Sequence, residues 1–159
     1  MHFRALFSLV AALVGCDASS RSPTPAPTPP AAAPVELVRA AAGDEDVRAI
    51  VVRERARRPS RDVLVYVGAP WCEPCVRFHD AAAAGKLDAA FPGLVLVELD
   101  ADRDAERLKR DGYASRLVPL FALPGADGAS TGRQIEGSIK GEGAVAEITP
   151  RLAALLGRH

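Results

Sequence analysis

Two cysteines separated by two residues, Cys72 and Cys75, stand at the junction between a predicted buried strand and a predicted helix. Of all features of the sequence, this arrangement most narrows the folds that the chain can adopt. Residues 63–67 form a continuous apolar run, which is typical of a strand buried on both sides. The predicted helix extends to about residue 84. One face of it would carry Cys75, Phe78, His79 and Ala82.

The remaining pattern alternates strands and helices. A weak edge strand is predicted at 35–38, a helix at 44–58 capped by Asp44, a buried strand at 94–99 and a charged helix at 102–111. Strands at 120–123 and 133–136 follow, separated by a turn at 125–132. The tail, 142–156, is helical by pattern, and Thr149 with Pro150 predicts a division into two short helices. This order implies parallel strands with crossover helices.

Two thiols on the first turn of a helix can close a small ring. The positive end of the helix stabilises a thiolate at Cys72 and lowers its pKa. That thiolate attacks a partner disulfide, and Cys75 then attacks the mixed disulfide and releases the partner. The pair therefore predicts dithiol–disulfide exchange.

Two other interpretations of the cysteine pair remain. A closed zinc site needs four ligands, and only His79 stands near enough in sequence to be a third, so we expect no metal site. We expect His79 to pack on the core side of its helix instead. An inert structural disulfide would close a very short loop and so stabilise the fold only slightly.

The chain resembles the thioredoxin family in two separate segments. Residues 69–75 (APWCEPC) resemble the family's active-site segment, and residues 113–119 (YASRLVP) resemble its approach to a cis-proline. The resemblance covers about residues 35–156. It implies an α/β thioredoxin fold, in which helices flank a central mixed sheet of four to five strands.

The resemblance also implies roles for individual residues. Cys72 would be the attacking thiol and Cys75 the resolving thiol. Pro119 would be cis and lie against the disulfide, and the Val118 backbone would pair with an extended substrate segment. Trp71 would shield the sulfurs or simply pack beside them.

Three residues around the cysteines need separate comment. Tyr66 stands where thioredoxins carry a buried aspartate, so the usual carboxylate relay is in doubt. Glu73 either disfavours the Cys72 thiolate or is an ordinary acidic residue of a first helical turn, and the second interpretation is preferred. Pro74 matches the proline that commonly precedes the second cysteine in this family.

The third cysteine, Cys16, follows a short apolar run, 5–14, that begins after Arg4 and is too short to span a bilayer. Residues 13–16 (LVGC) resemble the bacterial lipobox, in which the cysteine is lipidated and becomes the first mature residue. A lipoprotein signal peptide is therefore predicted at 1–15. Asp17 resembles a signal for retention in the inner membrane.

Residues 16–34 are predicted to form the lipidated cysteine and a linker, because six of the chain's 13 prolines lie there. The thioredoxin-like domain is predicted at 35–159. The 20 basic and 20 acidic residues balance, which argues against a nucleic-acid partner. We expect a monomer held on the membrane by lipid alone.

These features predict a periplasm-facing thiol–disulfide oxidoreductase on the inner membrane that acts on protein thiols and disulfides. It would need no cofactor beyond its own disulfide, and a membrane protein is the candidate electron donor. We favour a reductase over an oxidant or isomerase of the same fold. The alternative from another class is a metal-binding or scaffold protein.

Overall fold

The strand before the two cysteines, β2 (Val63–Gly68), lies at the centre of a five-stranded sheet. The computed structural model describes residues 33–158, within one compact unit, Ala31–His159. The other strands are β1 (Glu36–Arg39), β3 (Val95–Asp100), β4 (Leu120–Pro124) and β5 (Ser130–Glu136). Their spatial order is β1–β3–β2–β4–β5. β1 and β2 run parallel to β3, whereas β4 is antiparallel to β2 and β5 to β4.

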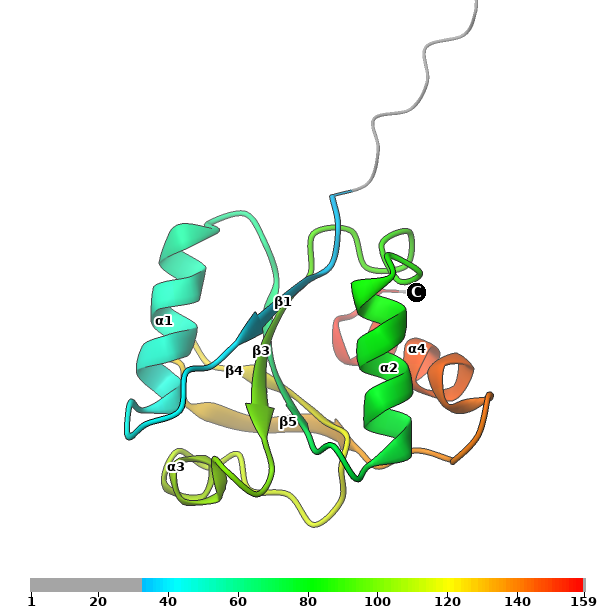
Figure 1. Ribbon diagram of the computed structural model, residues 1–159. Coiled ribbons are helices and arrows are strands. Elements are labelled where there is room, and N and C mark those ends of the chain that lie inside the picture. Colours follow the sequence, from blue (N-terminus) through cyan, green and yellow to red (C-terminus); the bar gives the residue numbers. More distant parts are fainter. Residues whose placement is uncertain (1–32, 159) are drawn as a thin grey trace, which may run out of the picture. The chain divides into compact units, whose positions relative to one another are not determined.

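Helices cover both faces of this sheet (Figure 1). On one face lie α1 (Val47–Arg57) and α3 (Ala105–Arg110), and on the other lie α2 (Glu73–Ala83) and α4 (Ala144–Leu155). A mixed sheet with this strand order and these flanking helices is the thioredoxin fold, so the predicted fold class is confirmed.

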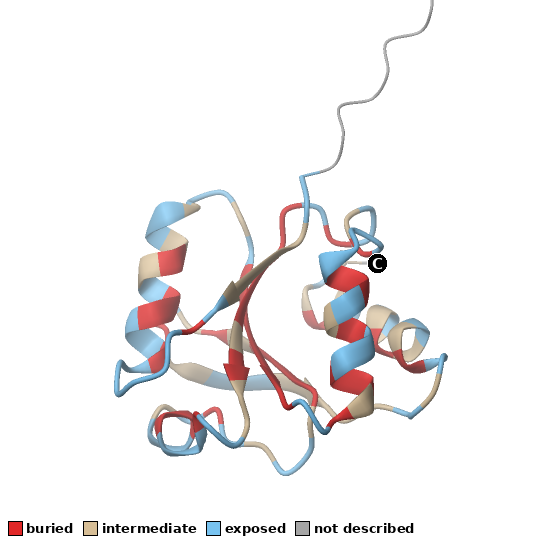
Figure 2. Cartoon of the chain, viewed as in Figure 1, coloured by how far each residue is buried: buried red, intermediate tan, exposed pale blue. Residues whose placement is uncertain are grey.

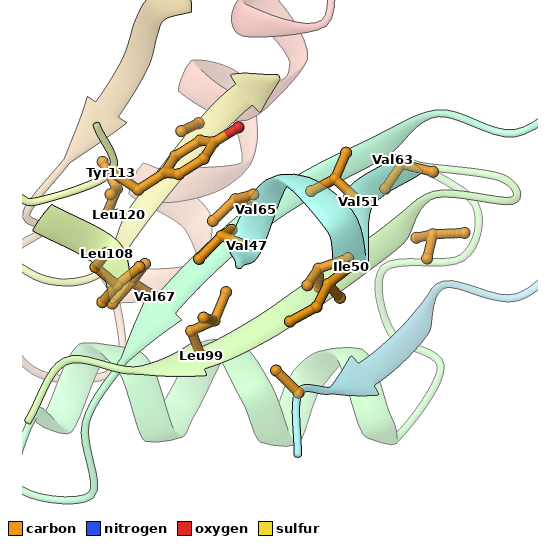
Figure 3. Packing of buried hydrophobic residues seen from close by; sticks show 14 residues of the cluster. Val47, Ile50, Val51, Val63, Val65, Val67, Leu99, Leu108, Tyr113 and Leu120 are labelled. Carbon is orange, nitrogen blue, oxygen red and sulfur yellow. The ribbon is translucent and has the colours of Figure 1, made fainter. Parts of the chain in front are cut away.

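Two apolar cores result from the alternation of side chains along the central strands. Val63, Val65 and Val67 of β2 point to the α1 side, where they join the cluster drawn in Figure 3. Leu64 and Tyr66 point to the opposite side, toward α2 and α4. Every residue of β2 is therefore buried, as Figure 2 shows for the middle of the sheet.

The start of α1 differs from the sequence prediction. The helix begins at Val47, and Asp46 rather than Asp44 occupies the cap position, without a capping hydrogen bond from its side chain. The carboxylate of Asp111 accepts the Val47 N–H instead, at 2.6 Å. The cap comes from 64 residues away, so no local pattern could have indicated it.

The prediction of two short C-terminal helices is wrong, because α4 is one helix that contains Pro150. Thr149 does not cap a new helix. Its hydroxyl donates to the Val145 carbonyl at 2.7 Å, one turn earlier. Ile148 and Leu152 are fully buried on either side of the proline, so packing against the sheet holds both halves in line.

A buried ion cluster joins α3 to the chain after β1. The Asp104 carboxylate accepts hydrogen bonds from Arg107, Arg103 and the Asp100 N–H, each at 2.7 Å. The side chains of Asp104 and Arg107 are 1% and 3% exposed. Arg107 also donates to the Ala41 carbonyl, so the cluster holds the loop between β1 and α1.

The predicted signal peptide, the predicted lipidation site at Cys16 and nearly all of the predicted linker lie outside the described residues. Within 33–158, no helix has the length and apolar character needed to cross a membrane.

Candidate active site

The two cysteines form a disulfide at the start of α2, with an S–S distance of 2.02 Å and Cα atoms 5.2 Å apart. Cys72 is the cap residue of the helix and has an extended backbone. Its Sγ accepts the Cys75 N–H at 3.3 Å. The sulfur of Cys72 thus lies at the positive end of the helix, where a thiolate is stabilised once the disulfide is reduced.

A distant segment completes the surroundings of the disulfide. The Val118–Pro119 peptide bond is cis, and Pro119 is buried directly before β4. Val118 packs against the small apolar cluster that contains both cysteines. Cys75 is 2% exposed and Cys72 is 5% exposed in this oxidised state. The fold therefore brings Val118 and Pro119 to the same site as Cys72 and Cys75.

Trp71 lies on the outside of the site. It is 66% exposed, and its Nε1 donates to the carboxylate of Asp102 at 2.6 Å. Most of the large apolar side chains exposed in the described residues belong to segments around the disulfide. We call these four side chains the apolar rim: Trp71, Val76, Leu117 and Ile139.

Glu73, between the cysteines, is held by contacts on two sides. It pairs with Arg77 one turn along α2, and it accepts the Gly141 N–H at 3.0 Å. The hydrogen bond from Arg77, followed by that from Gly141, lowers the pKa of Glu73. Pro74, the next residue, is buried in the first turn of α2.

Tyr66 does not supply a carboxylate near the disulfide. Its hydroxyl donates to the Cys75 carbonyl at 3.0 Å, and its ring stacks on Phe121 with ring centres 5.0 Å apart. Burial, with smaller contributions from the charges of Glu98 and Asp80, raises the pKa of Tyr66 far above its usual value. Tyr66 is therefore a neutral support for the first turn of α2.

A cavity of about 360 Å³ lies behind the disulfide. Its lining includes Tyr66, Cys75, His79 and Glu98. The prediction for His79 is wrong, because its side chain is 35% exposed at this cavity rather than packed in the core. Phe78, the preceding residue of α2, is fully buried. One further residue along the helix points in a different direction, so the His79 side chain lies at the edge of the buried face of α2.

Glu98 was not singled out from the sequence. Its side chain is 16% exposed, and its Oε1 lies 3.6 Å from Nε2 of His79. The available signal was a single carboxylate within an otherwise apolar strand, 94–99. Such a residue is uncommon in a buried strand unless it has a partner.

No cluster of three or more metal-ligating side chains occurs among residues 33–158. The Cys72–Cys75 disulfide is a redox group that the described side chains themselves form. Reduced, it supplies one thiol at a helix end and one buried thiol behind it, which is the arrangement needed for exchange with a second disulfide.

Comparison with solved structures found similar chains at low sequence identity. A chain from a study of the thiol-resolving mechanism of yeast mitochondrial 1-Cys peroxiredoxin is 20% identical, with a TM-score of 0.49 over 76% of this chain and 94% of that chain. Thioredoxin O1 from Arabidopsis thaliana in the oxidised state is 18% identical, with a TM-score of 0.48 over 77% and 96%. Trichomonas vaginalis thioredoxin is 18% identical, with a TM-score of 0.49 over 76% and 96%.

No model of a protein family and no curated protein matches the chain. The strand order and the pairing directions of the sheet define the fold class on their own.

Proposed function

We propose that this protein is a thiol–disulfide oxidoreductase that reduces disulfides in other proteins. The observation that carries the proposal is the Cys72–Cys75 disulfide at the capped start of α2, beside the cis Val118–Pro119 bond. A disulfide placed only for stability needs neither a helix end nor an apolar rim around it.

In the proposed reaction, the Cys72 thiolate attacks a substrate disulfide and releases one substrate thiol. Cys75 then attacks Cys72, which closes the disulfide and releases the second thiol. The substrate gains two electrons and the protein loses two. The Val118 backbone would pair with an extended substrate segment, and the apolar rim would contact its side chains.

The proposal extends to an anchor at Cys16 and to a position on the periplasmic side of the inner membrane. The LVGC pattern at residues 13–16 supports the anchor, and Asp17 supports the inner membrane. The proline-rich segment after Cys16 would then act as a spacer. A membrane protein would return electrons to the disulfide.

The first test is turnover. We expect the chain to accelerate the reduction of insulin by dithiothreitol, measured as the onset of turbidity when the B chain precipitates. Bovine serum albumin at equal concentration is the control for a protein without an active dithiol. If turbidity began no earlier than in the albumin control, the proposal of an enzyme would be wrong.

The direction of electron flow follows from the reduction potential of the Cys72/Cys75 pair, measured by equilibration with glutathione. A reductase requires a value near that of thioredoxin, about −270 mV, and an oxidant a value near about −120 mV. We expect the first. The second would reverse the proposed direction and keep the dithiol chemistry.

The anchor has its own test. In a bacterial host, Cys16→Ser should move the protein from the membrane fraction to the soluble fraction and abolish labelling by a radioactive fatty acid. The reason is that lipid chains supply the membrane affinity of a chain without excess positive charge. Ser19→Ala, a change three residues away, should alter neither. Membrane retention of the Cys16→Ser protein would contradict the anchor.

A further inference from the structure

Cys75 has a proton to lose in every catalytic cycle, and it lies where bulk water barely reaches it. The residue is 2% exposed, and burial in apolar surroundings disfavours a thiolate. The attack on Cys72 requires that thiolate. A group near Cys75 that takes up the proton would therefore speed this step.

Two acidic side chains of β3, Glu98 and Asp100, line the cavity that also contacts Cys75. The Asp100 carboxylate already accepts the N–H groups of Asp102 and Arg103, each at 2.9 Å, which leaves Glu98 as the carboxylate available to Cys75. In the β2–β3 pairing Glu98 stands opposite Tyr66, so both side chains leave the same face of the sheet, the face that α2 covers. Cys75 and Glu98 line the same cavity of about 360 Å³. That volume is large enough for solvent to bridge them.

His79 lines the same cavity and forms an ion pair with Glu98 when its imidazole is protonated. It follows Cys75 by one turn of α2, and its Nε2 lies 3.6 Å from the Glu98 carboxylate. Arg39 lies on the other side, with its Nε 3.5 Å from Glu98. The other charged or titratable groups near Glu98 are Tyr66 on β2, Asp80 on α2, Asp100 at the end of β3, and Arg103.

We propose that Glu98, positioned by His79, accepts the proton of the Cys75 thiol through solvent in this cavity. The step rests on the proposed dithiol function. The Cys75 S–H bond breaks and its proton passes to the carboxylate. The resulting thiolate attacks Cys72, the Cys72–Cys75 bond forms, and the electron pair of the mixed disulfide leaves on the substrate sulfur. When the disulfide is reduced again, Glu98 returns the proton to Cys75.

The test compares Glu98→Gln with the parent in insulin reduction between pH 6 and pH 10, with the substrate step limiting. Glutamine keeps the shape but cannot take up the proton. At pH 7 we expect turnover to fall by about 10-fold or more. The difference should shrink as pH rises, because hydroxide removes the thiol proton without help. A merely structural role would lower the rate equally at every pH.

Two variants complete the comparison. Glu106→Gln removes an exposed carboxylate on α3 and should leave the whole pH profile unchanged. His79→Gln should lower turnover at neutral pH less than Glu98→Gln does, because the acceptor remains. Circular dichroism of each variant checks that it is folded. A Glu98→Gln profile that follows the parent at all pH values would overturn the proposal.

A measurement without turnover separates this proposal from the proposed function. In a chain carrying Cys16→Ser and Cys72→Ser, Cys75 is the single thiol, and its alkylation by iodoacetamide can be followed against pH. Glu98→Gln should shift the midpoint to lower pH, since an ionised carboxylate near the thiol opposes the thiolate. An unchanged midpoint would exclude electrostatic coupling between Glu98 and Cys75 and so overturn the proposal, whether or not the parent reduces insulin.

Discussion

Cys72→Ser is expected to abolish insulin reduction, leaving the rate of dithiothreitol alone. Cys72 is the cysteine at the capped start of α2. A serine in its place carries a hydroxyl group, which can form neither a thiolate nor a mixed disulfide. The measurement is the turbidity assay at neutral pH. Cys16→Ser is the matched control, because it removes the one cysteine outside the Cys72/Cys75 pair and should leave the rate unchanged.

Cys75→Ser should have a different outcome. The attack by Cys72 still takes place, but the mixed disulfide has no second thiol to resolve it. A covalent complex with the substrate should therefore accumulate, visible on a non-reducing gel and lost on reduction. If Cys72→Ser matched the parent, or if Cys72→Ser rather than Cys75→Ser trapped the complex, the assigned roles would be wrong.

Asp104→Ala should lower the free energy of unfolding by about 3–5 kcal/mol, because it leaves the buried charge of Arg107 without its partner. The measurement is denaturation in urea with the disulfide intact. Asp62→Ala is the control. Asp62 pairs with Arg158 at the surface, at 2.7 Å with side chains 52% and 31% exposed, so its removal should cost less than about 1 kcal/mol.

The same cluster predicts a dependence on pH. Burial alone would raise the pKa of Asp104, but the hydrogen bonds from Arg103 and the Asp100 N–H, with the charges of Arg107 and Arg103, outweigh it and lower the pKa below 3.8. The stabilisation is therefore present above about pH 4 and lost as pH falls through the lower, folded value. The stability difference between the parent and Asp104→Ala should narrow below pH 4. A difference that stays constant down to pH 2 would contradict this assignment.

Much of this fold follows from local pattern. Continuous apolar runs predict the central strands, and charged segments with apolar residues on one face predict the helices. Both lie within a few residues of their observed bounds. The predictions that were wrong, for the start of α1 and for the continuity of α4, concern features that depend on contacts distant in sequence. Asp111 caps α1 from 64 residues away, and burial of Ile148 and Leu152 keeps α4 continuous through Pro150.

The candidate site divides in the same way. Cys72 and Cys75 carry their chemistry in their spacing, and the resemblance of residues 113–119 pointed to Pro119. His79 and Glu98 meet only because β3 pairs with β2 in a particular register and α2 covers that face. Sequence alone gives neither the register nor the turn of the helix, so it could not bring this pair together.

The hydrogen bond from Gly141 to Glu73 has a practical consequence for spectroscopy. The Gly141 N–H, in the loop before α4, donates to the carboxylate of Glu73, which stands between Cys72 and Cys75 and is 68 residues earlier in the chain. Any shift of that first helical turn between the oxidised and the reduced protein changes the length of this bond. The Gly141 amide resonance would register such a shift without an added label.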